Sequence, residues 1–215
     1  FEMARLHMID SRWDEAIAML DRAVAQGPER VVVYYNLGVC YENKKQRALA
    51  MEKYERTLIL QKVFGDACEK LSDYYSDLYE EKSERQYFDK AIMYINRQLE
   101  EIENCYYLVH RGLIYMDAFE LDLAIADFEK AIEYIPQDWA AHNNLGCCYK
   151  YRGLFDKAIE YLEKANEFLG DEKNPLPYSN MADCYAAKGE YEKAINCYEK
   201  ALKLDERQYF WKEIG

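Results

Sequence analysis

Side chains that can hold a peptide backbone recur in one local pattern of this sequence. Asn36, Asn144 and Asn180 each precede Leu or Met, which is followed by Gly or Ala. An amide side chain both donates and accepts hydrogen bonds, so it can pair with a peptide main chain whatever side chains that peptide carries. Asn at this position is therefore either a peptide-binding group or a residue that only caps or solvates a helix surface.

Groups that could catalyse a reaction are present, but they form no catalytic motif. The chain has no Gly-rich phosphate loop and no H-E-x-x-H, and none of its five serines lies in Gly-x-Ser-x-Gly or Ser-x-x-Lys. Carboxylates are abundant, as solvated helix faces at this charge density require. We therefore expect a protein that is not an enzyme and that uses no cofactor.

The seven cysteines do not form a metal or disulfide pattern. No Cys-x-x-Cys pair occurs, and the neighbouring Cys147 and Cys148 are poorly placed to bridge. Residues that recur at one position, as Cys40, Cys148 and Cys184 do, are most simply small packing residues. The three histidines fall in three different positions. The sequence predicts reduced structural thiols, no metal site and a reducing compartment, the cytoplasm.

The elements that position these residues follow from a repeat. Leu145, Gly146 and Tyr149, followed by Ala158 and Leu162, have spacings typical of two packed helices with small residues where the backbones are closest. Shifts of about 34 residues give six copies of this pattern. Their markers include Trp13 and Ala16, Leu37 and Gly38, Leu71 and Ser72, Arg111 and Gly112, and Met181 and Ala182.

This pattern resembles the tetratricopeptide repeat, W-x2-L-G-x2-Y…A-x3-F…P, which has a 34-residue period. The resemblance covers nearly the whole chain and implies an all-α fold, a right-handed α-solenoid of antiparallel helix pairs. In this family helices A, the first of each pair, line a concave groove. The expected single array, 1–215, has copies near 1–30, 31–64, 65–104, 105–138, 139–174 and 175–208, and a partial capping helix at 209–215.

Two segments depart from the regular period. The third copy is six residues longer than a period, and its insertion, 76–86, either extends a helix or forms a longer loop. Asp66 to Asp89 contains eight acidic and three basic residues, which predicts the most negative part of the array. We expect the last regular helix over 191–204 and a new helix from Arg207, with Tyr209, Phe210 and Trp211 exposed.

The resemblance implies a peptide-binding groove along helices A. Family members use Asn before Leu to hold extended peptides, which favours Asn36, Asn144 and Asn180. The expected groove residues are Tyr35, Asn36, Asn43, Lys70, Asp73, Asp77, Val109, His110, Asn143, Asn144, Lys150, Asn180 and Asp183.

The chaperone-tail clamp of some family members is disfavoured here. That clamp uses Lys and Asn on one helix A, Asn on the next, and Lys and Arg on the third. The corresponding positions in the first three copies hold Phe1 and Arg5, then Asn36, then Asp66 and Lys70. An Asp replaces a required Lys, and the last three copies lack the basic residues.

Charge and hydropathy limit the remaining partners. The formal net charge is −12, with 40 acidic and 28 basic residues. Nucleic-acid affinity depends on Lys and Arg contacts with phosphates, so nucleic acid is disfavoured. No apolar run has membrane-spanning length. Because the sequence starts with Phe1 inside a helix-like pattern, we expect it to be part of a longer chain.

Two functional hypotheses remain. In the first, the array is a monomeric adaptor that binds a protein or peptide segment whose basic and aliphatic side chains match Asp73, Asp77 and Val109. In the second, it is a scaffold that self-associates or docks a neighbouring domain through its ends, at the edge near Phe1 and at the aromatic tail.

Overall fold

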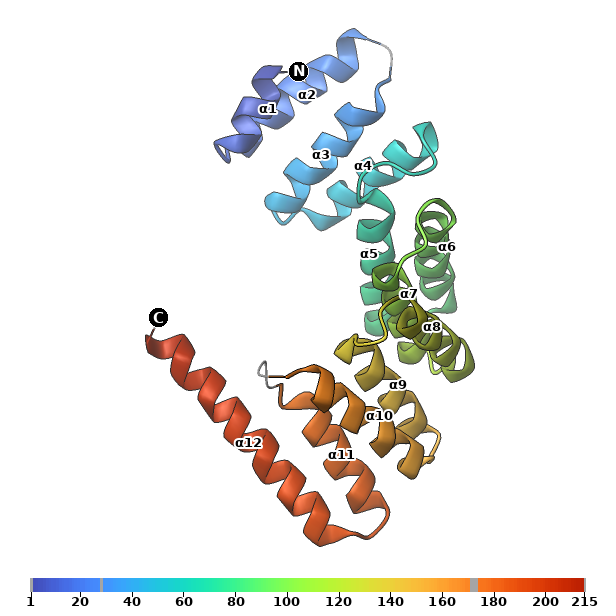
Figure 1. Ribbon diagram of the computed structural model, residues 1–215. Coiled ribbons are helices and arrows are strands. Elements are labelled where there is room, and N and C mark those ends of the chain that lie inside the picture. The colour runs from blue at the N-terminus through green and yellow to red at the C-terminus, as the bar shows by residue number, and fades with distance from the viewer. Residues whose placement is uncertain (1, 28, 171–173, 215) are drawn as a thin grey trace. The chain divides into compact units, whose positions relative to one another are not determined.

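The fold is entirely helical over the residues that the structure describes. The computed structural model describes the backbone of residues 2–27, 29–170 and 174–214, and the side chains of residues 3–27, 29–170 and 174–204. It contains twelve α-helices in these ranges and no strand (Figure 1). Contacts divide the chain into two compact units, 1–103 and 104–215. The predicted all-α array of helix pairs is confirmed.

The first unit contains three helix pairs. They are α1 (Glu2–Ile9) with α2 (Trp13–Gln26), α3 (Val31–Asn43) with α4 (Arg47–Leu60), and α5 (Ala67–Lys82) with α6 (Arg85–Glu101). Ala16 and Leu20 of α2 share one buried core with Leu37 and Cys40 of α3. Within this unit α2 and α4 therefore pack both on their own partners and on the first helix of the next copy.

The second unit repeats this arrangement. Its pairs are α7 (Cys105–Asp117) with α8 (Leu121–Tyr134), α9 (Trp139–Tyr151) with α10 (Phe155–Phe168), and α11 (Leu176–Ala187) with α12 (Tyr191–Ile214). Asn104 and Asp138 cap α7 and α9 by accepting hydrogen bonds from the backbone N–H groups of Tyr107 and Ala141. Both helices begin where the sequence supplies this acceptor.

Glycine marks the closest approach within three pairs, as the sequence predicted. A Cβ atom added to Gly38, Gly112 or Gly146 would lie only 2.5 to 2.7 Å from the second helix of the pair. The atoms that it would meet belong to Tyr54, Phe128 and Leu162. In the third pair the same position is Ser72, which is fully buried and donates a 3.0 Å hydrogen bond from Oγ to the carbonyl oxygen of Ala91.

The insertion of the third copy is helical. α5 ends at Lys82, ten residues after Ser72, whereas α7 ends five residues after Gly112. α6 begins six residues before Ala91, whereas α8 begins three residues before Ala124. Only Ser83 and Glu84 connect the two extended helices, and Ser83 makes the turn with φ of 55°. The extra residues therefore lengthen the helical hairpin at its tip.

The predicted end of the last helix is wrong. We expected a helix over 191–204 and a separate one from Arg207, but α12 runs without a break from Tyr191 to Ile214. The segment from Leu204 to Arg207 contains no Pro or Gly, so nothing in it stops the helix. The side chains of Tyr209, Phe210 and Trp211 lie outside the described residues, as does Phe1.

One ion pair recurs where consecutive copies meet. The second residue of a second helix is Asp, and it pairs with a basic residue at the C-terminal cap of the next first helix. The pairs are Asp14 with Lys44, Asp122 with Arg152, and Asp156 with Lys188. Exposed pairs of this kind contribute little energy each, about 0–1 kcal/mol. They mark equivalent geometry at three junctions.

Candidate functional site

Polar side chains from α9, α11 and α12 form one connected network in the second unit. Lys150 Nζ donates to Asn180 Oδ1 at 2.8 Å and to Asp183 Oδ2 at 2.9 Å. Asn180 Nδ2 donates to Asn143 Oδ1 at 3.2 Å, and Tyr198 donates to Asp183 at 2.6 Å. Asn143 and Lys150 are two turns apart on α9, so both face α11. The structure thus brings together four predicted groove residues, Asn143, Lys150, Asn180 and Asp183.

The electrostatics of this network favour its charged form. Burial is the largest single effect and opposes the charge on Lys150, but the hydrogen bond to Asp183 and Coulombic attraction to its neighbours together outweigh burial and raise the pKa of Lys150. Burial also opposes the charge on Asp183, and hydrogen bonds from Tyr198 and Lys150 lower its pKa. Asn143 is only 6% exposed. The amide groups of Asn143 and Asn180 are therefore already engaged inside the protein.

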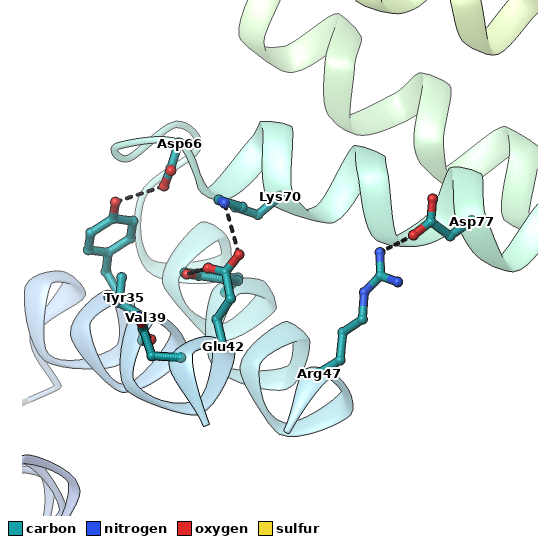
Figure 2. A network of polar contacts seen from close by, with 9 residues as sticks. Tyr35, Val39, Glu42, Arg47, Asp66, Lys70 and Asp77 are labelled. Atoms are coloured by element: carbon teal, nitrogen blue, oxygen red, sulfur yellow. Dashed lines mark hydrogen bonds and ion pairs between the residues drawn. The ribbon is translucent and has the colours of Figure 1, made fainter. Parts of the chain in front are cut away.

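A second polar surface lies on α3, α4 and α5 in the first unit (Figure 2). The hydroxyl of Tyr35 donates to Asp66 at 2.7 Å, and burial with this bond raises the pKa of Tyr35 to about 12. Glu42 accepts from Lys70 at 2.8 Å and from Tyr54 at 2.8 Å. Tyr35 therefore meets the N-cap residue of α5, and Lys70 of α5 meets a residue of α3. Asn43 donates to the carbonyl oxygen of Val39 on its own helix.

A pocket beside the third copy is lined by both basic and acidic side chains, although the sequence predicted that this part of the array would be the most negative. Arg47 pairs with Asp77, and its guanidinium lies 5.2 Å from the ring centroid of Tyr74. A pocket of about 340 Å³ is lined by three basic and two acidic residues and one Met. These are Lys45, Arg47, Lys70, Glu42, Asp73 and Met51. Arg47 of α4 and Lys45 of the preceding turn balance the carboxylates of α5. The sequence did not indicate that these two basic residues lie beside α5.

Asn36 lies in a different environment from the other two asparagines. It lines a groove of about 420 Å³ with Met8, Trp13, Val32 and Val39, and with Arg5 and Ile9. Its half-buried side chain makes no hydrogen bond with any described residue. Asn144 is intermediate, because its Oδ1 accepts from Asn143 at 3.3 Å while its Nδ2 has no partner within the described ranges. The three equivalent positions thus range from fully engaged to free.

Val109 and His110 lie on α7, which contributes no residue to the two networks described above. Val109 is half-buried against the core of the second unit. The ring of His110 lies 6.4 Å from the ring of Tyr106 in an edge-to-face arrangement. Val109 is therefore placed by packing, and His110 contacts a ring on its own helix.

Comparison with known families agrees with this architecture. Models described as tetratricopeptide repeat match residues 1–62, 106–138, 139–168 and 175–208. The chain belongs to the tetratricopeptide repeat family. Proteins of this family are typically non-catalytic interaction modules. These four matches do not extend over 63–105, where the third tetratricopeptide repeat carries the lengthened hairpin.

Individual relatives are distant. Human Superkiller complex protein 3 is 23% identical over 200 residues, which cover 76% of this chain and only 13% of that protein. A tetratricopeptide repeat protein from Parabacteroides merdae has a TM-score of 0.71 at 22% identity, covering 94% of this chain and 77% of its own. YrrB, a tetratricopeptide repeat protein with an unusual peptide-binding site, has a TM-score of 0.64 at 20% identity, with coverages of 86% and 91%. These similarities concern the fold.

Several contacts of this tetratricopeptide repeat array have no local sequence signal. Glu42 joins Tyr54 and Lys70, but Lys70 is 28 residues further along the chain. In the fourth copy Arg111 forms two hydrogen bonds of 2.7 and 2.6 Å with Asp127, which is 5% exposed. The departure from Leu to Arg at the Arg111 position is visible in the sequence, and it could have prompted a search for an acidic partner on the second helix.

The cysteines pack as the sequence predicted. All seven are buried and unbridged, and Cys40, Cys148 and Cys184 are each 0% exposed. Burial raises the pKa of Cys148 to about 12 and that of Cys40 and Cys184 to about 11, so these thiols stay protonated at neutral pH. Among the described residues no three His, Cys, Asp or Glu side chains are grouped closely enough to hold a metal ion. No described helix is long and apolar enough to cross a membrane.

Proposed function

We propose that this chain is a non-catalytic protein-interaction module that binds a peptide or protein segment along its helices A. One observation carries this proposal: the amide of Asn36 has no partner among the described residues and lies in an apolar groove. A half-buried amide without a partner is free to exchange hydrogen bonds with the main chain of a ligand.

The lining of the groove indicates the chemistry of the ligand. Met8, Trp13, Val32 and Val39 offer apolar surface, so we propose that an extended segment places an aliphatic side chain among them. Burying such a side chain contributes about 1.5–3 kcal/mol before the costs of association. This supports the aliphatic part of the partner expected from the sequence. The mixed charge of the pocket around Lys70 gives no preference for a basic partner.

The other two asparagines have different proposed roles. Asn180 is held by Lys150 and Asn143, so a ligand would have to displace an existing hydrogen bond to reach it. We assign Asn180 and Asn143 to positioning of the surface. Asn144 keeps a free donor and is the proposed contact with a ligand in the second unit.

The test is selection from a random peptide library followed by fluorescence polarisation with the selected peptides. We expect Asn36→Ala to weaken binding about tenfold, which corresponds to the loss of about 1.4 kcal/mol from one or two hydrogen bonds. Asn43→Ala is the matched control, because among the described residues Asn43 donates its hydrogen bond to Val39 on its own helix. Equal affinities of the wild type and Asn36→Ala would exclude this groove.

The compartment is part of the same proposal. Seven buried, unbridged thiols support a reducing environment, and we propose the cytoplasm.

A further inference from the structure

One turn of the second unit holds a large aromatic side chain in a backbone conformation that such residues rarely adopt. Phe119 follows α7 with φ of 61°, in the left-handed region. The equivalent positions of other copies carry small or polar residues with positive φ, namely Ser11, Lys45, Gly153 and Gly189. Phe119 is 67% exposed, so its ring gains little from burial at this turn. Packing therefore does not account for a phenylalanine here.

Phe119 and Tyr151 form an exposed aromatic pair between consecutive copies. Their ring centroids are 5.5 Å apart, and the angle between the ring planes is 43°. Tyr151, the last residue of α9, is 49% exposed. The next residue, Arg152, pairs with Asp122, three residues after Phe119. The ring pair and the ion pair thus join the same two segments, and we name Phe119, Tyr151 and Asp122 the aromatic ledge.

The charges around the aromatic ledge favour a cation as its ligand. Residues 117–122 contain three acidic residues and no Lys or Arg. The two basic residues that approach from the next copy are each held by a carboxylate. Lys150 Nζ lies 5.6 Å from the ring centroid of Tyr151, whereas no cation of the described residues lies over the ring of Phe119. This ring is therefore exposed, and it is flanked in the sequence by carboxylates.

The chain itself shows which side chain covers a ring beside a carboxylate. The guanidinium carbon of Arg85 lies 4.0 Å from the ring centroid of Phe88, and Arg85 also pairs with Asp89 at 3.3 Å. A guanidinium suits both partners because it is planar, weakly hydrated and a fork-shaped donor. The same arrangement joins Arg47 with Tyr74 and Asp77, Arg56 with Tyr34 and Glu29, and Arg111 with Tyr115 and Asp127. At the aromatic ledge the ring and carboxylates are present without a guanidinium over the ring.

We propose that the aromatic ledge binds an arginine side chain of a partner protein segment, with the guanidinium over the ring of Phe119 and directed at the carboxylate of Asp122. Although Asp122 pairs with Arg152, its side chain is 88% exposed. Arginine fits this open site better than lysine, because a guanidinium is less strongly hydrated than an ammonium group. The inference rests on the proposed function for the nature of the ligand, a peptide or protein segment, and adds the side chain that this segment carries.

Titration of the full chain with acetyl-arginine methylamide tests the ledge directly. With isotope-labelled phenylalanine, the NMR signal of Phe119 is identified by its loss in Phe119→Gly. We expect the arginine probe to shift this signal, and the citrulline analogue, which keeps the shape but lacks the charge, to shift it much less. Equal shifts with both probes, or no shift with either, overturn the inference. This readout needs no peptide, so it is independent of the groove at Asn36.

Peptides selected on the full chain from a random library provide the second test, by fluorescence polarisation. Phe119→Gly should weaken binding of the selected peptides about fivefold, the scale of one exposed cation–π contact. Replacing the peptide's arginine by citrulline should weaken binding to the wild type by a similar factor and binding to Phe119→Gly no further. Tyr191→Ala is the matched control, because Tyr191 is 65% exposed beside the turn of the sixth copy and makes no ring contact within the described ranges.

Stability separates a binding role of Phe119 from a structural one. Phe119→Gly places glycine in a left-handed conformation, so the melting temperature should stay the same or rise. Weaker binding that accompanies a lower melting temperature would assign Phe119 to the fold and overturn the inference. Peptides whose binding depends on Asn36 and not on Phe119 also overturn it, and they leave the proposed function in place. Absence of any peptide binding, with the arginine-induced shift of Phe119 intact, contradicts the proposed function alone.

Discussion

Ser72 donates a hydrogen bond of 3.0 Å to the carbonyl oxygen of Ala91 at the position where three other copies have glycine. The third copy therefore joins its two helices with a polar contact where the others use close packing. Because the hydroxyl is fully buried, Ser72→Ala should lower the free energy of unfolding by about 1 kcal/mol. Urea denaturation gives this value, and Ser76→Ala on the same helix is the control. Equal losses in both variants contradict the role of the hydroxyl.

The close approach at glycine predicts a steric effect. Gly146→Leu should destabilise the protein by about 1–3 kcal/mol, because its Cβ alone meets Leu162 at 2.7 Å. Gly27→Ala is the matched control, since a Cβ there meets only the carbonyl oxygen of Ala23, at 3.8 Å. The melting temperatures of the two variants and the wild type measure this loss of stability. An unchanged melting temperature for Gly146→Leu is incompatible with the observed packing.

The ion pair of the fourth copy predicts strong coupling between two residues. Arg111→Leu leaves Asp127 buried without its guanidinium and should cost about 3–5 kcal/mol. The fifth copy has Leu145 and Tyr161 at these positions. The double variant Arg111→Leu with Asp127→Tyr should therefore recover most of the loss. A double-mutant cycle from chemical denaturation measures the coupling, and additive losses would contradict it.

The asparagines predict a separation of stability from binding. Asn180→Ala removes an acceptor from Lys150 and a donor to Asn143, so it should lower the free energy of unfolding by about 1–2 kcal/mol. Asn36→Ala removes no hydrogen bond to the described part of the chain and should change the free energy of unfolding by less than about 0.5 kcal/mol. Parallel urea titrations compare the free energies of unfolding of the two variants. The reverse order of effects would show that Asn36, and not Asn180, is the structural residue.

The buried thiols predict a dependence on alkaline pH. Cys148 has a pKa of about 12 in the folded chain against an ordinary value of 9.0, so the folded state binds the proton more tightly. This contribution to stability is complete below pH 9.0 and is lost as the pH rises toward about 12. The pKa of Cys184, raised by burial to about 11, acts in the same direction.

Two measurements check the thiol prediction. The free energy of unfolding should fall between pH 9 and pH 11 by urea titration. At pH 8 a thiol reagent should react slowly with the native protein and quickly with all seven cysteines in denaturant. Rapid native labelling of Cys148 contradicts its burial.

The regular parts of the fold could be predicted because local signals agree. We expected copies near 105–138 and 139–174, and the helix pairs α7–α8 and α9–α10 span 105–134 and 139–168. Small residues at Gly146 and Ala158, a turn at Gly153 and proline near the copy boundaries all indicate the same register. The end of α12 was predicted wrongly because it was set from the length of a regular copy, although the sequence contains no helix-stopping residue there.

The state of each candidate site residue could not be predicted from its repeat position. Asn36 and Asn180 occupy the same position of the repeat. Asn180 on α11 accepts a hydrogen bond from Lys150, which lies on α9, the first helix of the preceding copy. The charge around Asp77 was likewise misjudged, because Arg47 is 30 residues away in the sequence and adjacent in space. Register fixes the direction of a side chain, whereas its partner depends on the residue that the neighbouring copy supplies.

The lengthened hairpin of α5 and α6 has an evolutionary consequence. Both additions lie at the tip, where the chain turns back at Ser83, so the path goes out along one helix and returns along the other. The base of the hairpin is joined by the hydrogen bond from Ser72 to the carbonyl oxygen of Ala91. Growth at this tip leaves that contact unchanged. Insertions and deletions of paired turns can therefore accumulate at this tip while α5 and α6 keep their contact at the base.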